Sequence, residues 1–410
     1  MIPVPFMRVW WCVGVVVAFA ACRGGFDAPG DAGDEADARV FFDGPSTAFD
    51  AGDGGMVTSR AVSAGGAHAC AVVDGALWCW GSNLEGQLGQ GDLVSRSQAT
   101  RVAPDAPWLD VTVGGVHTCA IRADRTLWCW GGNASGQLGI GSAVTPQPSP
   151  QPVSLPRPVV VAASSGNHTC AILDDTSLWC WGANFDGQTA QNDPFDSPDV
   201  LAPSRVGADI GWSAIAGSDG VTLGILAGAA RGSGRNTESQ LGLGAPAPSQ
   251  VRTMTAIDPG PWMAVSSALG SSCGLKADAS AWCWGNNTMA QIALPALIQY
   301  DVPTLLDDTA TWQTISVDAF GGCGINDGGV LRCWGRNDEG QIGFGSYTTT
   351  PLAPFTSGTF TDWTAFSMSR FHACGQRADG GVWCAGENTY GQVGTGDTMR
   401  RYAWTQVSLP

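Results

Sequence analysis

Most of the chain alternates between short apolar segments and clusters of glycine, proline and polar residues. Residues 108–115 (WLDVTVGG) and 312–319 (WQTISVDA) place apolar and polar side chains alternately, which predicts half-buried β-strands. Residues 70–80 (CAVVDGALWCW) contain two apolar runs around Asp-Gly, a dipeptide typical of two-residue β-hairpin turns. Because no helical period is evident after residue 57, the pattern predicts an all-β fold.

The same order of elements recurs seven times. Each copy has an alternating segment, a hairpin, a loop with the pattern G-x-N-x-x-x-Q and a proline-containing stretch. The seven glutamines follow one another at intervals of 50 to 52 residues. Short strands repeated at such a period are typical of β-propeller blades. We therefore expect residues 57–410 to form one seven-bladed β-propeller rather than two or three domains.

The asparagine and glutamine of each loop are predicted to be scaffold residues. Asparagine tolerates left-handed backbone, and both side chains can bond loop backbone. Their presence in every copy favours a structural role, because a single active site would mark a single blade. The fourteen residues are Asn83, Gln87, Asn133, Gln137, Asn184, Gln188, Asn236, Gln240, Asn287, Gln291, Asn337, Gln341, Asn388 and Gln392.

The two ends of the array predict how the ring closes. Residues 397–410 match the stretch that follows the loop in other copies, and residues 57–68 match the segment that leads into the second hairpin. We expect the first blade to combine strands from both ends of the chain. Such a closure would leave no strand edge exposed at the seam.

The hairpin and its loop resemble the regulator of chromosome condensation repeat family. The match is clearest at GSNLEGQLGQG (residues 81–91) and GGNASGQLGIG (residues 131–141), and it extends over residues 57–410. The resemblance implies a seven-bladed propeller. The founding members of the family are nuclear exchange factors for a small GTPase, a function that we do not expect for an acidic, exported chain. Other members are bacterial secreted or surface proteins, including β-lactamase inhibitors, that bind a protein partner across one propeller face.

The amino terminus is similar to a bacterial lipoprotein signal. Residues 9–21 form a 13-residue apolar run, which is short for a membrane span, and small residues precede Cys22. The resemblance implies cleavage before Cys22 and a diacylglycerol on its sulfur, with the outer membrane favoured because Arg23 follows. The alternative is an ordinary signal peptide cut near Ala21, which would leave a secreted protein.

These observations divide the chain into three parts. Residues 1–21 are a predicted signal peptide, and residues 57–410 are the propeller. Residues 22–56, with the lipidated cysteine, are acidic and rich in glycine, alanine and aspartate. Because such a composition cannot bury enough apolar surface to order itself, we expect a disordered tether.

Twelve of the fourteen cysteines form six pairs that flank hairpins. Each pair is nine or ten residues apart and centred on a predicted turn, so its members face each other across antiparallel strands. Disulfides are favoured in an exported protein, whereas zinc, the rival hypothesis, does not suit this spacing. The fourth copy has Leu223 and Gly232 in place of both cysteines. The pairs are Cys70 with Cys79, Cys119 with Cys129, Cys170 with Cys180, Cys273 with Cys283, Cys323 with Cys333, and Cys374 with Cys384.

Composition and the absence of known catalytic motifs exclude several classes of function. With 20 basic and 36 acidic residues the formal net charge is −16, which argues against nucleic-acid binding. No hydrolase, zinc-protease, phosphate-loop or dinucleotide-binding motif occurs, so we expect no enzymatic activity, cofactor or metal. We expect a monomer that binds a protein partner on one propeller face and contacts the membrane only through its lipid. The alternative is a secreted inhibitor or a glycan-binding propeller.

Two groups of residues are candidates for function. All four histidines (His68, His117, His168 and His372) stand two residues before the first cysteine of a copy. We favour hydrogen bonds to backbone within each histidine's own blade. The alternative is an arc of imidazoles near the centre of the ring that binds a metal or an anionic partner.

The second group comes from copies three to five, which depart from the repeat by an irregular insert at residues 189–210, a lost Trp-Cys-Trp and lost loop glycines. These departures fall in adjacent blades, where they could build one binding surface. The alternative, which the sequence favours equally, is neutral sequence drift in blades whose packing tolerates it. The candidate surface comprises Phe195, Asp196, Asp199, Arg205, Arg231 and Arg235.

Overall fold

The computed structural model describes residues 60–192, 198–294, 298–306 and 310–410, with the backbone alone at 60 and 348–356. The predicted signal peptide, tether and lipidated Cys22 lie outside these residues. The described part contains 28 β-strands and no helix, so it has no helix that could cross a membrane.

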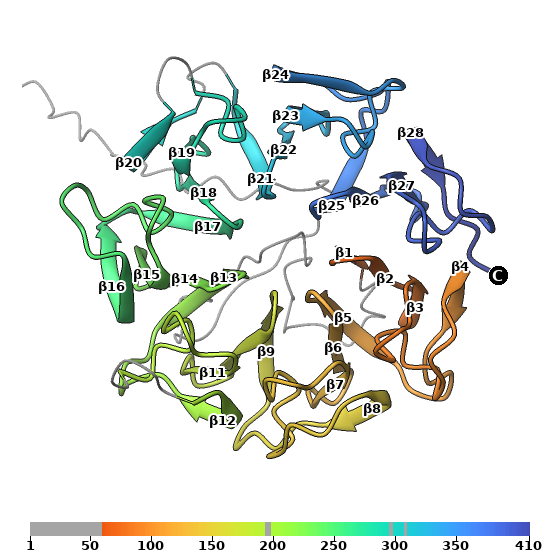
Figure 1. The fold of residues 1–410 in the computed structure, drawn as a ribbon, viewed down its shortest axis with the longest axis horizontal. Helices are drawn as coiled ribbons and strands as arrows, with labels where there is room; N and C mark the ends of the chain where they lie inside the picture. The colour runs from red at the N-terminus through yellow and green to blue at the C-terminus, as the bar shows by residue number, and fades with distance from the viewer. Residues whose placement is uncertain (1–59, 193–197, 295–297, 307–309) are drawn as a thin grey trace, which may run out of the picture. The chain divides into compact units, whose positions relative to one another are not determined.

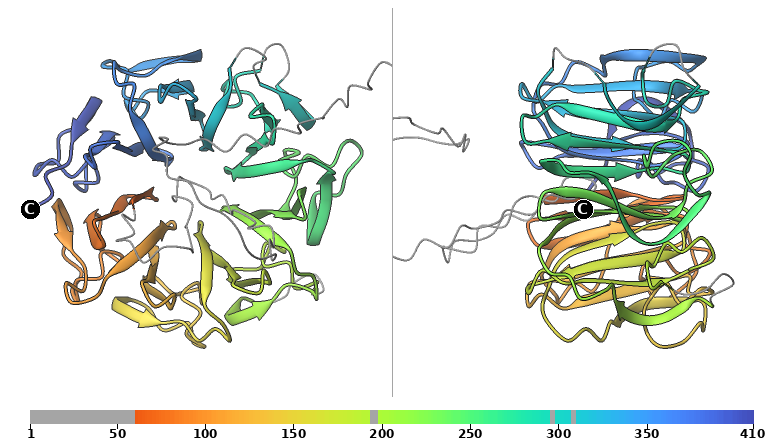
Figure 2. Two further views of the ribbon diagram at one scale, coloured as in Figure 1. Left: turned by 180° about the vertical axis from the view of Figure 1, so that it is seen from behind. Right: turned by 90° about the vertical axis from the view of Figure 1, so that its left-hand side faces the viewer.

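The strands form seven antiparallel sheets of four strands each, arranged in a ring (Figure 1). Figure 2 shows the same ring from behind and from the side. The predicted all-β, seven-bladed propeller is confirmed. Within every sheet the strand order follows the chain from the innermost strand to the outermost.

The four positions within a blade are occupied by the following strands. The innermost strands are β1 (Arg60–Ala64), β5 (Trp108–Val113), β9 (Val159–Ser164), β13 (Trp212–Ser218), β17 (Trp262–Ser267), β21 (Trp312–Val317) and β25 (Trp363–Met368). The second strands are β2 (His68–Val73), β6 (His117–Arg122), β10 (His168–Leu173), β14 (Val221–Leu226), β18 (Ser271–Lys276), β22 (Gly321–Asn326) and β26 (His372–Arg377). The third strands are β3 (Ala76–Gly81), β7 (Leu127–Gly131), β11 (Leu178–Gly182), β15 (Ala229–Arg235), β19 (Ala281–Asn286), β23 (Leu331–Asn337) and β27 (Val382–Gly386). The outermost strands are β4 (Arg96–Arg101), β8 (Gln147–Pro152), β12 (Val200–Arg205), β16 (Gln250–Asp258), β20 (Gln299–Leu305), β24 (Thr348–Thr356) and β28 (Arg401–Gln406).

Ring closure differs from the expectation in one respect. The first blade does not combine strands from both ends of the chain, because β1 to β4 form a complete sheet and β25 to β28 form another. The physical reason is the order of elements within a copy: the lead-in segment is the innermost strand and pairs with the hairpin that follows it. The two ends of the chain therefore meet by packing of one whole blade against another.

The hydrophobic core lies between the blades rather than within them. One cluster joins Val72 and Leu77 of blade 1 to Trp108 and Trp130 of blade 2. The equivalent cluster at the seam joins Trp80 of blade 1 to buried residues of blade 7. Each blade is thus stabilised mainly by apolar surface that its two neighbours cover.

Each blade presents one end to each face of the ring. β3 begins after the turn at Asp74 and Gly75 and ends at Gly81, where the G-x-N-x-x-x-Q loop begins. Both turn residues have positive φ (51° and 76°), as a two-residue hairpin turn of this hand requires. We call the side that carries the hairpin turns the hairpin face and the side that carries the loops the loop face.

Candidate functional site

The asparagine and glutamine of each loop brace that loop. In blade 1, Asn83 Nδ2 donates to the Asp92 carbonyl at 2.8 Å, and the Leu88 amide donates to Asn83 Oδ1 at 2.8 Å. The Glu85 amide donates to Gln87 Oε1 at 2.9 Å. The two bonds from backbone amides recur in all seven loops. These side chains are therefore occupied within the scaffold.

In five of the seven joints, the backbone carbonyl of the loop glutamine accepts an indole N–H of the next blade. Trp130 Nε1 of blade 2 donates to the Gln87 carbonyl of blade 1 at 2.9 Å. At the seam, Trp80 Nε1 donates to the Gln392 carbonyl of blade 7 at 2.9 Å, so the seam has the same joint as the interior of the chain. Three further joints use the same bond. The fourth and seventh blades lack the tryptophan of this joint.

In those two blades the outermost strand supplies the missing bulk. Trp404 on β28 packs against Trp363, with ring centroids 4.9 Å apart, and it lies over Gly343 of the preceding loop as Trp130 lies over Gly89. Met254 on β16 stands at the same strand position and packs into the cluster between blades 3 and 4. The other five blades carry alanine or proline there. That contrast was the sequence signal for this compensation.

All six predicted cysteine pairs are disulfide-bonded, with S–S distances of 2.01 to 2.13 Å and Cα–Cα distances of 4.0 to 4.1 Å. Every sulfur-bearing residue of the pairs is buried, and each pair is directly opposed in its hairpin. Leu223 and Gly232 are opposed in the same way in blade 4. Blade 4 therefore has the backbone geometry for a seventh disulfide but lacks the two cysteines.

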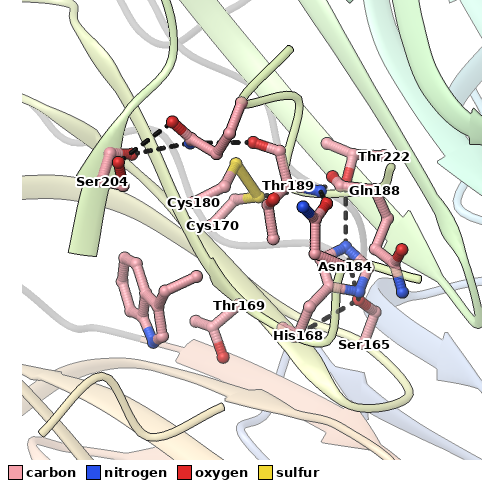
Figure 3. The surroundings of a disulfide bond; sticks show 12 residues. Ser165, His168, Thr169, Cys170, Cys180, Asn184, Gln188, Thr189, Ser204 and Thr222 are labelled. Carbon is pink, nitrogen blue, oxygen red and sulfur yellow. Dashed lines mark hydrogen bonds between the residues drawn. A yellow bond between two sulfur atoms is a disulfide. The ribbon is translucent and has the colours of Figure 1, made fainter. Parts of the chain in front are cut away.

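Three of the four histidines hydrogen-bond to a threonine of the next blade. In Figure 3, His168 Nε2 lies 2.8 Å from Thr222 Oγ1, which donates to the Gln188 carbonyl at 2.7 Å. Because the threonine proton is used in that bond, the imidazole is the donor at Nε2. The partner is a side chain across the blade boundary rather than backbone of the histidine's own blade, which corrects the favoured expectation. The other two pairs are His68 with Thr118 and His117 with Thr169, each at 2.9 Å.

The fourth histidine differs only in its neighbour. His372 Nδ1 lies 2.8 Å from Ser369 Oγ, and the blade that follows has Ala69 at the position where the neighbours of the other three histidines have threonine. All four rings are buried, and burial lowers their pKa values to about 3 or about 4. They are neutral at physiological pH. Among the described residues, no group of three or more histidine, cysteine, aspartate or glutamate side chains could hold a metal ion.

The four described residues of the candidate partner surface do not form one patch. Phe195 and Asp196 lie outside the described residues. Asp199 accepts the Asn184 amide at 3.3 Å and thereby braces the loop of blade 3. Arg235, on the loop face, forms an ion pair with Asp186 of the preceding blade at 2.8 Å.

The remaining two arginines of that set lie toward the opposite face. Arg205 pairs with Trp179 near the hairpin end of blade 3, and Arg231 pairs with Gly224 near the hairpin end of blade 4. Arg231 also donates to the Met254 carbonyl at 3.2 Å. The departures in copies three to five are thus largely absorbed by the scaffold, which agrees with the alternative of drift.

The loop face carries exposed apolar side chains over four contiguous blades. We call the set in blades 7, 1, 2 and 3, with exposed fractions of 43 to 72%, the apolar arc; Ile298, Phe344 and Tyr347 add further exposed apolar side chains in the loop segments of blades 5 and 6. The members of the arc are Leu84, Val94, Val144, Phe185, Tyr390 and Met399. The loop asparagines hold the backbone of this arc in place, because they donate to the carbonyls of Val144 and Met399. Sequence periodicity could not find the arc, since it arises from positions that differ between copies.

The ends of the innermost strands line a cavity of about 220 Å³ that is open to solvent at the loop face. Its wall consists mainly of glycine, alanine, serine and threonine, with three charged residues: Asp219, Asp318 and Arg370. Asp318 is buried, and burial raises its pKa to about 7. Asp110 on β5 is a second buried acid, away from this wall, whose pKa burial also raises to about 7.

Comparison with known proteins gives the same architecture. The family model described as "Regulator of chromosome condensation (RCC1) repeat" matches residues 74–121 and 125–172, and a second model of that description matches residues 60–87, 108–137, 159–188 and 363–392. The curated ultraviolet-B receptor UVR8 of Arabidopsis thaliana is 27% identical over 152 residues, which are 36% of this chain and 34% of the receptor. The chain thus matches about a third of that relative's length.

Solved structures of the same fold cover most of the described residues. Human WBSCR16 has a TM-score of 0.73 and 20% identity, with 82% of this chain and 95% of that chain covered. Prp20p from Saccharomyces cerevisiae, described with its binding properties to Gsp1p and histones, has a TM-score of 0.70 and 18% identity, with 81% and 85% covered. These likenesses establish the fold. Together with the repeat matches and the seven sheets, they show a seven-bladed β-propeller that contains regulator of chromosome condensation repeats.

Proposed function

We propose that this chain is an exported propeller that binds a protein partner through its loop face and carries out no chemistry of its own. The apolar arc is the observation that supports this choice of face. Contiguous exposed apolar side chains are uncommon on monomeric proteins and usually mark an interaction site. Prp20p, which has the same fold, binds Gsp1p and histones, and this supports the propeller as a protein-binding fold.

We further propose that the propeller is held at the cell envelope by a lipid on Cys22. The amino-terminal pattern supports this part of the proposal, with residues 23–56 as the tether and the outer membrane as the favoured site. Six buried disulfides support export, because disulfides of this kind persist in oxidising compartments.

Cross-linking on intact cells tests the binding face. We expect Phe185→Asp, at an arc residue with 72% of its surface exposed, to abolish the cross-linked partner band that the unaltered protein gives. Ile210→Asp is the matched control, since Ile210 is 63% exposed beside the hairpin end of blade 3. Loss of the band in the Ile210 variant alone, or in neither variant, would refute the assignment of the loop face.

Mass spectrometry of the mature amino terminus tests the anchor separately. An acyl mass on Cys22, with release of Cys22→Ser into the soluble fraction, is the expected result. A mature chain that begins near residue 22 without an acyl group would establish the secreted form instead, and the face assignment would be unaffected.

A further inference from the structure

The boundary between blades 3 and 4 lacks two kinds of bond that hold other neighbouring blades together. Ser233 on β15 stands where five blades carry the tryptophan whose indole donates to the preceding loop. Ala163 on β9 stands where five blades carry serine or threonine. Four of those hydroxyls accept a backbone amide of the next innermost strand at 2.8 to 3.1 Å. Blade 4 is also the blade without a cysteine pair, since Leu223 and Gly232 replace it.

No other boundary combines these two losses. Between blades 6 and 7 the third-strand indole is missing, but blade 6 carries Ser316 at the hydroxyl position, and Trp404 supplies another indole bond to blade 6. Between blades 4 and 5 the hydroxyl is missing because Ala216 stands there, but Trp284 keeps the indole bond at 2.9 Å. Each of these boundaries therefore retains one of the two bonds or a substitute for it.

The chain seam has both bonds. Trp80 Nε1 donates to the Gln392 carbonyl at 2.9 Å, and the Ala64 amide donates to Ser367 Oγ at 3.1 Å. In a ring of repeats, each boundary adds its own share to the stability of the blades beside it. The weakest boundary is therefore the one between blades 3 and 4, inside the chain, and not the seam where the two chain ends meet.

Polar contacts on the loop face hold this boundary instead. Arg235 of blade 4 forms its ion pair with Asp186 of blade 3 at 2.8 Å, and Arg252 donates to the Phe185 carbonyl at 3.0 Å. Inside, the boundary keeps the histidine–threonine bond of Figure 3. Its apolar cluster comprises nine buried residues among those described, against ten to thirteen at the other boundaries. Because the Arg235 side chain is 34% exposed, dissolved salt screens its ion pair.

We propose that the ring opens reversibly at the boundary between blades 3 and 4, and that a rise in ionic strength favours the open state. Local opening begins where the fewest buried contacts must be broken, and this boundary has the fewest. Opening breaks the ion pair of Asp186 and the bond from Arg252, and it thereby releases the blade 3 loop that carries Phe185, the most exposed residue of the apolar arc. The inference goes beyond the proposed protein partner, because the opening is a property of the propeller alone.

Native-state hydrogen exchange of the purified chain, followed by mass spectrometry, tests the opening. Peptides from β13 and from the blade 3 loop (residues 183–192) should exchange about tenfold faster than those from β5 and the blade 1 loop (residues 82–91), which occupy the same places between blades 1 and 2. Raising sodium chloride from about 0.05 M to about 0.5 M should speed exchange in β13 about twofold to fivefold and leave β5 unchanged. Fastest exchange at the seam, or equal exchange in all blades, would overturn the proposal. An unchanged rate in β13 would overturn the role of salt.

Two substitutions at the boundary should move the exchange rate in opposite directions. Arg235→Gln removes the ion pair, so exchange in β13 should become about twofold to fivefold faster and lose its response to salt. Arg336→Gln is the matched control, since Arg336 stands at the same loop position in blade 6 and pairs with Asp338 of its own blade. Ala163→Ser supplies a hydroxyl for the Gly217 amide and should slow exchange in β13 about fivefold. Equal effects of the two arginine variants, or no slowing by Ala163→Ser, would contradict an opening at this boundary.

Discussion

Trp404 should be the most sensitive single residue of the outermost strands, because it replaces the tryptophan that blade 7 lacks. It has 8% of its surface exposed, packs against Trp363 and donates from Nε1 to Ser357 Oγ at 2.9 Å. Removing a buried tryptophan side chain costs about 3–5 kcal/mol. At roughly 2.1 cal/mol/K for each residue, a propeller of about 350 residues has an unfolding entropy of about 0.7 kcal/mol/K. Trp404→Ala should therefore lower the melting temperature by about 4–7 °C.

A double-mutant cycle shows whether Trp404 acts as a substitute for the missing third-strand residue. Ala385 on β27 stands where other blades carry the tryptophan, and it belongs to the same buried cluster as Trp404. Ala385→Trp alone should destabilise by about 1–3 kcal/mol, because the space is already filled. Combined with Trp404→Ala, it should recover most of the lost stability, measured by calorimetry. Purely additive effects of the two changes would refute the reasoning, since independent sites show no coupling.

Three further changes test other parts of the scaffold. Leu223→Cys with Gly232→Cys should form a seventh disulfide once the neighbouring Leu241 shifts, and free-thiol titration would detect the bond. Closing a ten-residue loop should raise the free energy of unfolding by about 2–3 kcal/mol and the melting temperature by about 3–4 °C. A formed bond with a lower melting temperature would contradict this expectation. Thr169→Val leaves the buried His117 Nε2 without its acceptor and should lower the free energy of unfolding, measured in urea, by about 1–3 kcal/mol. Ser272→Ala is the control, because the blade before Ser272 has no histidine, and it should cost less. Equal losses in the two variants would show that the histidine bond contributes nothing to stability. Stability should fall as the pH drops from about 6.5 towards 4, because the unfolded chain protonates four histidines whose folded pKa values are about 3 or about 4. The two buried aspartates act in the opposite sense, since their raised pKa of about 7 favours folding on acidification, but they are outnumbered; urea midpoints that rise on acidification in this window would contradict the balance.

The repeat determined which parts of the structure could be predicted. The hairpins, their cysteine pairs and the bracing loops are local, so each copy contains all the partners that its own pattern requires. Contacts between blades were harder to predict from the sequence, because they join residues that belong to different copies of the repeat. The histidine–threonine bonds join residues 50 to 54 positions apart in the chain. That Trp404 replaces the missing third-strand tryptophan becomes visible only when one outer-strand position is compared across all seven copies.

The candidate site was less predictable for a related reason. Copies three to five break the repeat pattern, which favoured them as a binding surface, yet Asp199 and Arg235 hold loops and blades together. Asp318 stands where the other six copies have glycine, alanine or serine, and Arg370 stands at a position that varies between copies. Only the ring brings them to one cavity.

Because every blade is complete in sequence, the ring has no strand that must return from the far end of the chain. The seam uses the same indole-to-carbonyl joint as its interior counterparts, although its residues are 312 positions apart. A circular permutant opened between any two blades would therefore keep every strand beside its own partners. The same property allows a whole copy to be duplicated or deleted without orphaning a strand.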